Sequence, residues 1–194
     1  MNVTLDECFQ FGLGAFETIG IEQGTPIFLE KHLKRLERAA DFLKLGSPSE
    51  RGITARKIEE YLKEQKTHPE VQKEFDSLEH CALKVMLTKE NVFYSLRANH
   101  YTPEKYEKGF FIDISAVKRN ETSPLVYPKT MNYGDCILEK RKATAAGMDE
   151  RLFLNTKEQV SEGTVSNVFF VRNGVICTPQ VSCGLLPGIL REYL

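Results

Sequence analysis

Apolar and polar residues alternate along four stretches of the first half of the chain, which is the pattern of strands with one buried face. Residues 15–21 and 25–29 are separated by the turn residues Glu-Gln-Gly, and residues 81–88 and 92–99 by Lys-Glu-Asn. Short polar turns of this kind join antiparallel neighbours. We therefore expect two β-hairpins in this half of the chain.

A helical period replaces this alternation between the two hairpins. In residues 30–45, leucine and alanine recur every three or four positions, and Gly46 follows where a left-handed residue commonly ends a helix. Thr54 is suited to cap a second helix that runs to about Gln65. The charged stretch 66–80 lacks a clear period, and we expect a short helix or a loop there.

Strand patterns return in the second half of the chain, after a polar connection at residues 101–109. A helical stretch follows Tyr133 and stops at Gly147. The last two strand patterns enclose Arg172-Asn173-Gly174, and Asn-Gly is a strong hairpin signal. The expected strands are residues 110–117, 151–154, 159–161, 165–171 and 175–178.

Composition narrows the class of protein. Of the 194 residues, 41% are hydrophobic and 27% are charged, which supports a packed core rather than disorder. The net charge of -1 gives no reason to expect nucleic acid or an acidic membrane as a partner. There is no run of about 18 apolar residues and no signal peptide, so we expect no membrane span. The five cysteines form no Cys-x-x-Cys pair and make no metal-ligand spacing with the histidines, which favours reduced thiols in the cytoplasm.

The candidate chemistry lies between Glu162 and Leu190. An acid precedes the last predicted hairpin, and the Pro187-Gly188 turn after it opens a predicted helical turn at residues 189–194. Backbone N–H groups and the positive end of a helix dipole favour a phosphate at such a position. Each feature alone is weak evidence, since most Pro-Gly turns are only turns and a lone Glu is usually solvated.

Taken in order, these residues resemble the fold-type IV, or class IV, pyridoxal-phosphate enzymes. That family includes branched-chain and D-amino-acid aminotransferases and 4-amino-4-deoxychorismate lyases. The resemblance implies an α+β fold of two domains, residues 1–108 and 109–194, with bound pyridoxal 5′-phosphate. It also implies a homodimer with the active site near its interface. The matching positions are Glu162, Thr164, Asn167, Val168, Phe169, Ile176, Thr178, Leu186, Gly188, Ile189 and Arg191.

The same resemblance implies a catalytic lysine. The segment Lys129-x-x-Asn-Tyr resembles the one that carries the family's Schiff-base lysine, upstream of the acid Glu162. The Schiff base needs a primary amine whose pKa can be lowered, and lysine supplies one. Lys129 would then also move the substrate's α-proton as general acid and base. Glu162 would pair with the pyridine nitrogen, Leu186 would pack on the ring face, and Tyr133 would lie near the phenolic oxygen.

Two segments are assigned to the cofactor phosphate by the resemblance. His32–Leu36 resembles the family's His-x-x-Arg-Leu, in which the arginine binds the phosphate as a planar, permanently charged fork. Charge pattern alone would instead leave Arg35 on a solvated basic face. The second segment would contribute its backbone N–H groups, at Gly188, Ile189 and Leu190.

Two further residues are candidates for contact with the substrate. Phe16 opens a Phe-Glu-Thr-Ile sequence and would face the substrate by resemblance, while an ordinary core aromatic is the alternative. Arg97 lies on the second returning strand, where it would either contact a substrate carboxylate or stand on the sheet surface.

Three functions stay open at this point. The Phe-Glu-Thr-Ile opening and the compact length favour a lyase that converts 4-amino-4-deoxychorismate to 4-aminobenzoate and pyruvate in folate synthesis. The sequence Thr88-Lys89-Glu90 departs from the Thr-Arg-Gly-type turn expected of the lyases, so a branched-chain or D-amino-acid aminotransferase is the alternative. The third hypothesis is a truncated, non-catalytic homologue, because the family continues for several elements beyond Leu194 and unpaired strands are costly.

Overall fold

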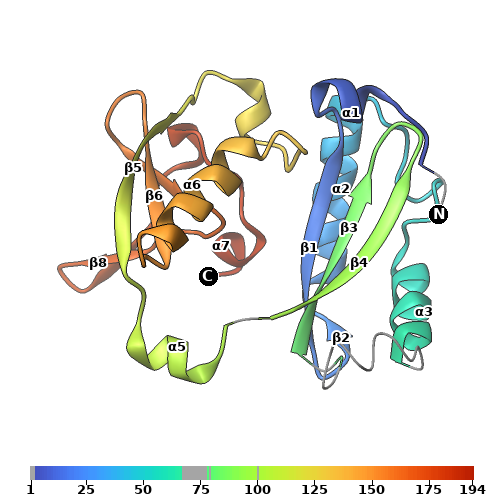
Figure 1. The fold of residues 1–194 in the computed structure, drawn as a ribbon, viewed down its shortest axis with the longest axis horizontal. Helices are drawn as coiled ribbons and strands as arrows, with labels where there is room; N and C mark the ends of the chain where they lie inside the picture. The colour runs from blue at the N-terminus through green and yellow to red at the C-terminus, as the bar shows by residue number, and fades with distance from the viewer. Residues whose placement is uncertain (1–2, 67–77, 79, 100) are drawn as a thin grey trace. The chain divides into compact units, whose positions relative to one another are not determined.

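The computed structural model describes residues 3–66, 78, 80–99 and 101–194, which form two units (Figure 1). The first unit comprises Met1–His100 together with Lys129–Met131, and the second comprises Tyr101–Pro128 and Asn132–Leu194. The predicted short helix or loop at residues 66–80 falls largely outside the described residues. Within the described ranges, every helix is too short or too polar to cross a bilayer.

An antiparallel sheet of four strands forms the centre of the first unit, in the order β2-β1-β3-β4. Both predicted hairpins are present, and pairing of β1 with β3 joins them into one sheet. The strand expected at residues 25–29 is wrong beyond Pro26, because α2 begins at Leu29. In this pairing Phe16 lies opposite Met86, and Lys84 lies between Thr18 and Ser95. The strands are β1 (Ala15–Glu22), β2 (Thr25–Pro26), β3 (His80–Leu87) and β4 (Val92–Ala98).

One face of this sheet is covered by α2 (Leu29–Leu43), which Figure 1 shows behind the strands. The other helices of the unit are α3 (Ala55–Lys66) and α1 (Glu7–Phe11), and only α1 was not predicted. Burial of each large aliphatic side chain contributes about 1.5–3 kcal/mol. The fully buried core includes Ile19, Ile21, Leu36, Ala40, Leu83, Val85 and Leu87.

The end of α2 differs from the prediction. Lys44, not Gly46, is the left-handed residue that caps the helix, with φ 56°, and its N–H donates to the carbonyls of Ala40 and Asp41. Gly46 also has a left-handed conformation, with φ 85°, but it lies after the cap, in the turn that follows the helix. A non-glycine residue is tolerated in this conformation because the cap satisfies helix carbonyls that would otherwise lack donors.

A mixed sheet of three strands, in the order β5-β6-β7, organises the second unit. β5 and β6 run parallel, and α6 makes the crossover between them and packs on both. β7 returns antiparallel to β6 and contains the predicted acid, Glu162, as its penultimate residue. The elements are α5 (Pro103–Lys108), β5 (Ile112–Arg119), η1 (Pro124–Val126), α6 (Gly134–Ala145), β6 (Glu150–Asn155) and β7 (Val160–Gly163).

The last part of the chain corrects one predicted strand. Residues 165–171 were expected to be extended, but β8 includes only Phe170–Arg172 and pairs with β9 (Val175–Cys177) around the Asn-Gly turn. The residues after Gly163 form a turn instead, because Thr164 and Ser166 donate hydrogen bonds to a carboxylate on β6. The chain continues through η2 (Val181–Cys183) to α7 (Ile189–Tyr193).

Candidate active site

Lys129 is attached to the first unit by backbone pairing. β2 pairs only with Ile21 and Glu22, and the segment around Lys129 pairs with the other end of β1. Phe16 donates its N–H to the carbonyl of Lys129 at 3.1 Å, and Met131 donates to Gly14 at 2.7 Å. The backbone on both sides of the lysine side chain is therefore held by hydrogen bonds to the sheet.

The side chain of Lys129 extends over Phe16, with its Nζ 4.4 Å from the ring centroid. A second ammonium, that of Lys84, lies 4.7 Å from the same ring. Contacts of this kind between an ammonium and an aromatic face are attractive. The structure thus brings Lys129 and Phe16 together, and it adds Lys84, which the sequence reasoning missed.

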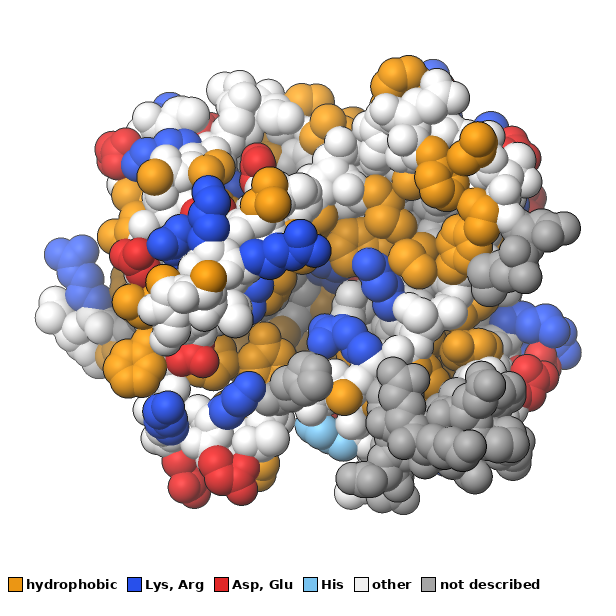
Figure 2. Space-filling view, viewed as in Figure 1, with side chains coloured by type: hydrophobic (Ala, Val, Ile, Leu, Met, Phe, Trp, Pro, Cys, Tyr) orange, Lys and Arg blue, Asp and Glu red, His pale blue; other side chains and the backbone are white. Residues whose placement is uncertain are grey.

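These side chains share the face of the sheet opposite α2. Phe16 and Thr18 alternate with the buried core residues of β1, and Lys84 is their cross-strand neighbour. Arg97 is the diagonal neighbour of Lys84 on β4, and burial together with the charge of Arg97 lowers the pKa of Lys84. Basic and hydrophobic side chains are intermingled on the side of the molecule seen in Figure 2. A cationic face with an aromatic floor suits an anionic organic molecule.

Arg35 lies on the α2 side of the sheet, bound to Glu17. Its Nε and Nη2 donate to the two carboxylate oxygens of Glu17 at 2.7 and 2.6 Å, and His32 Nδ1 lies 2.7 Å from the same group. Glu17 is only 1% exposed. Burial alone would raise the pKa of Glu17, but the hydrogen bonds and charges of Arg35 and His32 lower it below its ordinary value. The guanidinium therefore has a fixed orientation.

Glu17 was also missed from the sequence, although a signal was present. It stands in an otherwise apolar strand, and the predicted helix that follows carries the basic segment His32–Leu36. A buried acid requires a partner, and this helix was the nearest source of one.

In the second unit, Glu162 is buried at the end of β7. Its Oε1 lies 2.9 Å from Arg119 Nη2, and its Oε2 accepts the N–H of Leu186 at 3.1 Å. The guanidinium of Arg119 also lies over the Phe153 ring, with 5.5 Å from its carbon to the ring centroid. The structure thus brings Glu162 to the backbone of Leu186 and supplies Arg119, a partner with no sequence signal.

Gly188 occupies a position without room for a side chain. An added Cβ would lie 2.1 Å from Asn167 Oδ1, so this backbone and the Asn167 amide are in close approach. Gly188 precedes α7, whose first residues are the predicted phosphate-binding Ile189 and Leu190. Tyr133, half-buried, directly precedes α6.

The comparisons with known proteins agree on one family. Residues 14–194 match the family model described as amino-transferase class IV. The chain is 25% identical over 206 residues to the aminodeoxychorismate lyase of Bacillus subtilis, covering 97% of this chain and 66% of that protein. It is 27% identical over 203 residues to the branched-chain-amino-acid aminotransferase of Pseudomonas aeruginosa, covering 98% of this chain and 65% of that protein.

Solved structures share the fold. A provisionally named 4-amino-4-deoxychorismate lyase of Legionella pneumophila superposes with a TM-score of 0.77 at 27% identity, covering 100% of this chain and 71% of that one. A fold IV transaminase of Curtobacterium pusillum superposes with a TM-score of 0.82 at 24% identity, covering 99% of this chain and 68% of that one. The chain spans 66% and 65% of the lengths of the Bacillus and Pseudomonas proteins.

Proposed function

The chain belongs to the amino-transferase class IV family, and from this premise we propose that Lys129 is the Schiff-base lysine of a pyridoxal-phosphate enzyme acting on an amino acid or a related amine. Members of this family are enzymes that use pyridoxal 5′-phosphate. One observation supports the proposal above the others. The backbone of Lys129 is fixed on β1, and its amine lies 4.4 Å from the ring centroid of Phe16.

Three groups of the chain have the chemistry that this cofactor needs. A phosphate needs backbone N–H groups, and those of Gly188, Ile189 and Leu190 would supply them, with the Gly188 backbone packed closely against the Asn167 amide. A protonated pyridine nitrogen needs an anionic acceptor, and Glu162 is a buried carboxylate paired with Arg119. Lys129 supplies the primary amine.

The proposed roles divide between proton transfer and orientation. When bound, the cofactor supplies an electron sink for carbanion chemistry at the substrate's α-carbon. Lys129 Nζ would hold the cofactor and would take up and return the substrate's α-proton. Glu162 would accept a hydrogen bond from the pyridine nitrogen of the cofactor. Leu186 and Tyr133 would contact the cofactor ring.

The family resemblance assigns the cofactor phosphate to Arg35, and this role stays a proposal, because Arg35 pairs with Glu17 on the α2 side of the sheet while Lys129 lies over Phe16 on the opposite face. A guanidinium already fixed by a buried carboxylate loses little side-chain entropy when it binds a phosphate oxygen. The backbone N–H groups that share this role are those of Gly188, Ile189 and Leu190.

For the substrate we propose 4-amino-4-deoxychorismate, with 4-aminobenzoate and pyruvate as products. This compound carries two carboxylates, and the cationic face formed by Lys84 and Arg97 beside Phe16 suits such an anion. The similarity to the Bacillus lyase over 97% of the chain supports the same choice. The alternative is a branched-chain or D-amino-acid aminotransferase, supported by the similarity to the Pseudomonas enzyme.

Two assays of the same preparation separate these functions. With 4-amino-4-deoxychorismate, 4-aminobenzoate fluorescence should rise without 2-oxoglutarate. With leucine or D-alanine, 2-oxoglutarate consumption should stay at background. The opposite result identifies an aminotransferase, and silence in both assays favours the non-catalytic homologue. Lys129→Ala should abolish whichever activity is found, while Lys89→Ala, on an exposed turn, should retain it.

We further propose a homodimer located in the cytoplasm. The location is supported by the cysteines, because all five are free thiols, as expected in a reducing compartment. The dimer is supported by membership of the family and is tested by light scattering in solution.

A further inference from the structure

Glu150, the first residue of β6, is a buried carboxylate that the roles above do not use. It is 3% exposed. It accepts the N–H and the hydroxyl of Thr164, the hydroxyl of Ser166 at 2.8 Å and the N–H of Val165 at 3.4 Å. The N–H of Arg151 donates to it as well, at 2.8 Å. Among the described residues no cation forms an ion pair with Glu150, so backbone and hydroxyl donors alone compensate its buried charge.

All but one of these donors belong to a single turn, residues 163–166. The turn is closed by a hydrogen bond from the N–H of Gly163 to the carbonyl of Ser166 at 2.9 Å. A Cβ on Gly163 would lie 2.2 Å from Ser166 Oγ and 3.2 Å from the Glu150 carboxylate. The backbone therefore packs directly against the carboxylate, and only glycine fits at this position.

The residues on either side of this turn are proposed cofactor ligands or their direct contacts. Glu162, before the turn, accepts the N–H of Leu186. Asn167, after it, is the residue whose amide approaches Gly188. The conformation of the turn thus fixes the spacing between the group assigned to the pyridine nitrogen and the group beside the phosphate loop.

We propose that Glu150 is a positioning residue for the cofactor, acting through the 163–166 turn on Glu162 and Asn167. This inference rests on the proposed function, because it assigns cofactor roles to the two flanking residues. Glutamine would keep one acceptor oxygen and place an amide NH2 group against the donors of the other, so either Thr164 or Ser166 would lose its acceptor.

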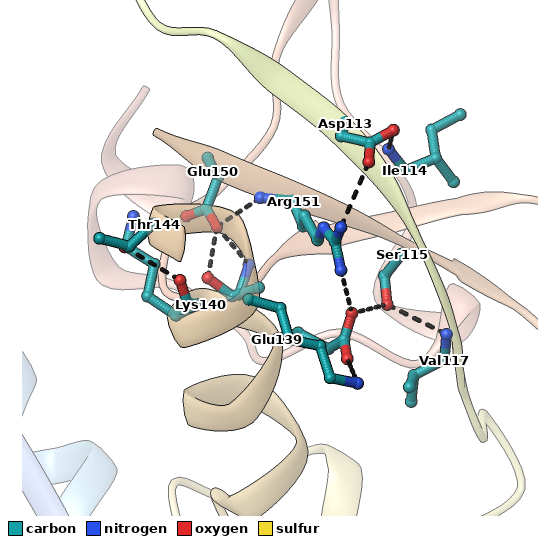
Figure 3. Close-up of polar contacts among 11 residues, drawn as sticks. Asp113, Ile114, Ser115, Val117, Glu139, Lys140, Thr144, Glu150 and Arg151 are labelled. Atoms are coloured by element: carbon teal, nitrogen blue, oxygen red, sulfur yellow. Dashed lines mark hydrogen bonds and ion pairs between the residues drawn. The ribbon is translucent and has the colours of Figure 1, made fainter. Parts of the chain in front are cut away.

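Figure 3 shows a second buried carboxylate of the same unit, that of Glu139, which provides a control for Glu150. Glu139, on α6, is equally buried, and it lies on the other side of Arg151 from Glu150. Its carboxylate accepts hydrogen bonds from Ser115, Arg151 and Lys142. None of these partners belongs to the 163–166 turn, although the carbonyl of Arg151 accepts the N–H of Thr164 at 3.1 Å. Glu139→Gln therefore removes a buried carboxylate from this unit while every hydrogen-bond donor to Glu150 stays present.

The experiment measures the Kd for pyridoxal 5′-phosphate by absorbance titration of the wild type, Glu150→Gln and Glu139→Gln. We expect Glu150→Gln to raise Kd at least tenfold, with a changed absorption maximum of the bound cofactor, and Glu139→Gln to leave both unchanged. Amide hydrogen exchange without cofactor gives a second readout. Exchange at Thr164 and Val165 should quicken at least tenfold more in Glu150→Gln than in Glu139→Gln, whose general loss of stability is common to the whole unit.

Equal Kd values in folded Glu150→Gln and Glu139→Gln would overturn the inference while leaving the proposed function intact. If Glu150→Gln does not fold, Ser166→Ala and Thr164→Val replace it, and each should raise Kd about threefold, since each removes one of the donors that fix the turn to the carboxylate. An unchanged Kd in both would overturn the inference equally. A wild-type chain that binds no cofactor would overturn the proposed function, and this inference with it.

Discussion

Replacement of Glu139 by glutamine should destabilise the second unit in a pH-dependent way. The carboxylate is 2% exposed and accepts hydrogen bonds from Lys142 Nζ at 2.6 Å, Ser115 Oγ at 2.8 Å and Arg151 Nη1 at 3.1 Å. Hydrogen bonds from Lys142 and Ser115, and then from Arg151, outweigh the opposing effect of burial and lower the pKa of Glu139 from 4.5 to about 2.

The size of the effect follows from this shift. Each pKa unit corresponds to about 1.4 kcal/mol of differential stabilisation, so the full shift corresponds to about 3 kcal/mol. The Lys142 side chain is 61% exposed, and solvent screens its share of the interaction. We therefore expect Glu139→Gln to lower the free energy of unfolding by about 2 kcal/mol at pH 7. The effect of Glu150→Gln is compared with a control variant that carries this loss of stability.

The pH dependence has a definite sign. A carboxylate whose pKa is lowered by folding stabilises the protein above its ordinary pKa of 4.5, and this contribution is lost as the pH falls toward about 2. Glutamine has no such contribution at any pH. The stability difference between the wild type and Glu139→Gln should therefore be largest at pH 7 and should narrow below about pH 5.

Urea unfolding followed by circular dichroism at pH 7, 5 and 4 measures this difference. Glu158→Gln is the control, since Glu158 pairs with Lys118 in the same unit but its side chain is 68% exposed, and it should cost less than about 0.5 kcal/mol. Equal losses for the two variants at pH 7, or a Glu139→Gln loss that does not change with pH, would refute the reasoning.

Three other substitutions give expected outcomes. Glu17→Gln should cost about 2–4 kcal/mol in urea unfolding and weaken cofactor binding, because the nearly buried guanidinium of Arg35 loses its anionic partner; unchanged stability would contradict the pairing. Gly188→Ala should raise the Kd for pyridoxal 5′-phosphate at least tenfold, since its Cβ would collide with Asn167, and an unchanged Kd would exclude this backbone from phosphate binding. Lys84→Met should raise KM for 4-amino-4-deoxychorismate about tenfold with little change in cofactor affinity; an equal KM would remove Lys84 from the substrate site.

Local patterns predicted most of the secondary structure because burial imposes a simple period. The alternation at residues 15–21 and 81–88 left one face apolar, and that face became the core beneath α2. The strand predicted at residues 165–171 was wrong over residues 165–169 for a tertiary reason. Thr164 and Ser166 hydrogen-bond to Glu150, which is remote in sequence, and no period in the chain records that contact.

For the candidate site, too, local motifs were predictable from the sequence and tertiary contacts were not. Motif order predicted Lys129, Glu162 and the loop at Gly188 as site residues, and the comparisons with known proteins confirm the family to which those motifs point. The partners of these residues were not predictable, because strand register and burial decide them. Glu17 is identified only when α2 places Arg35 against it, and Lys84 only when β3 pairs with β1.

The attachment of pyridoxal 5′-phosphate to Lys129 is the central claim, and borohydride reduction followed by peptide mass spectrometry tests it most directly. The chain incubated with cofactor and reduced should carry one phosphopyridoxyl group, on the peptide that contains Lys129. The same treatment of Lys129→Ala should give no adduct. A label on Lys84, which contacts the same Phe16 ring, or no label on the wild-type chain, would contradict the account.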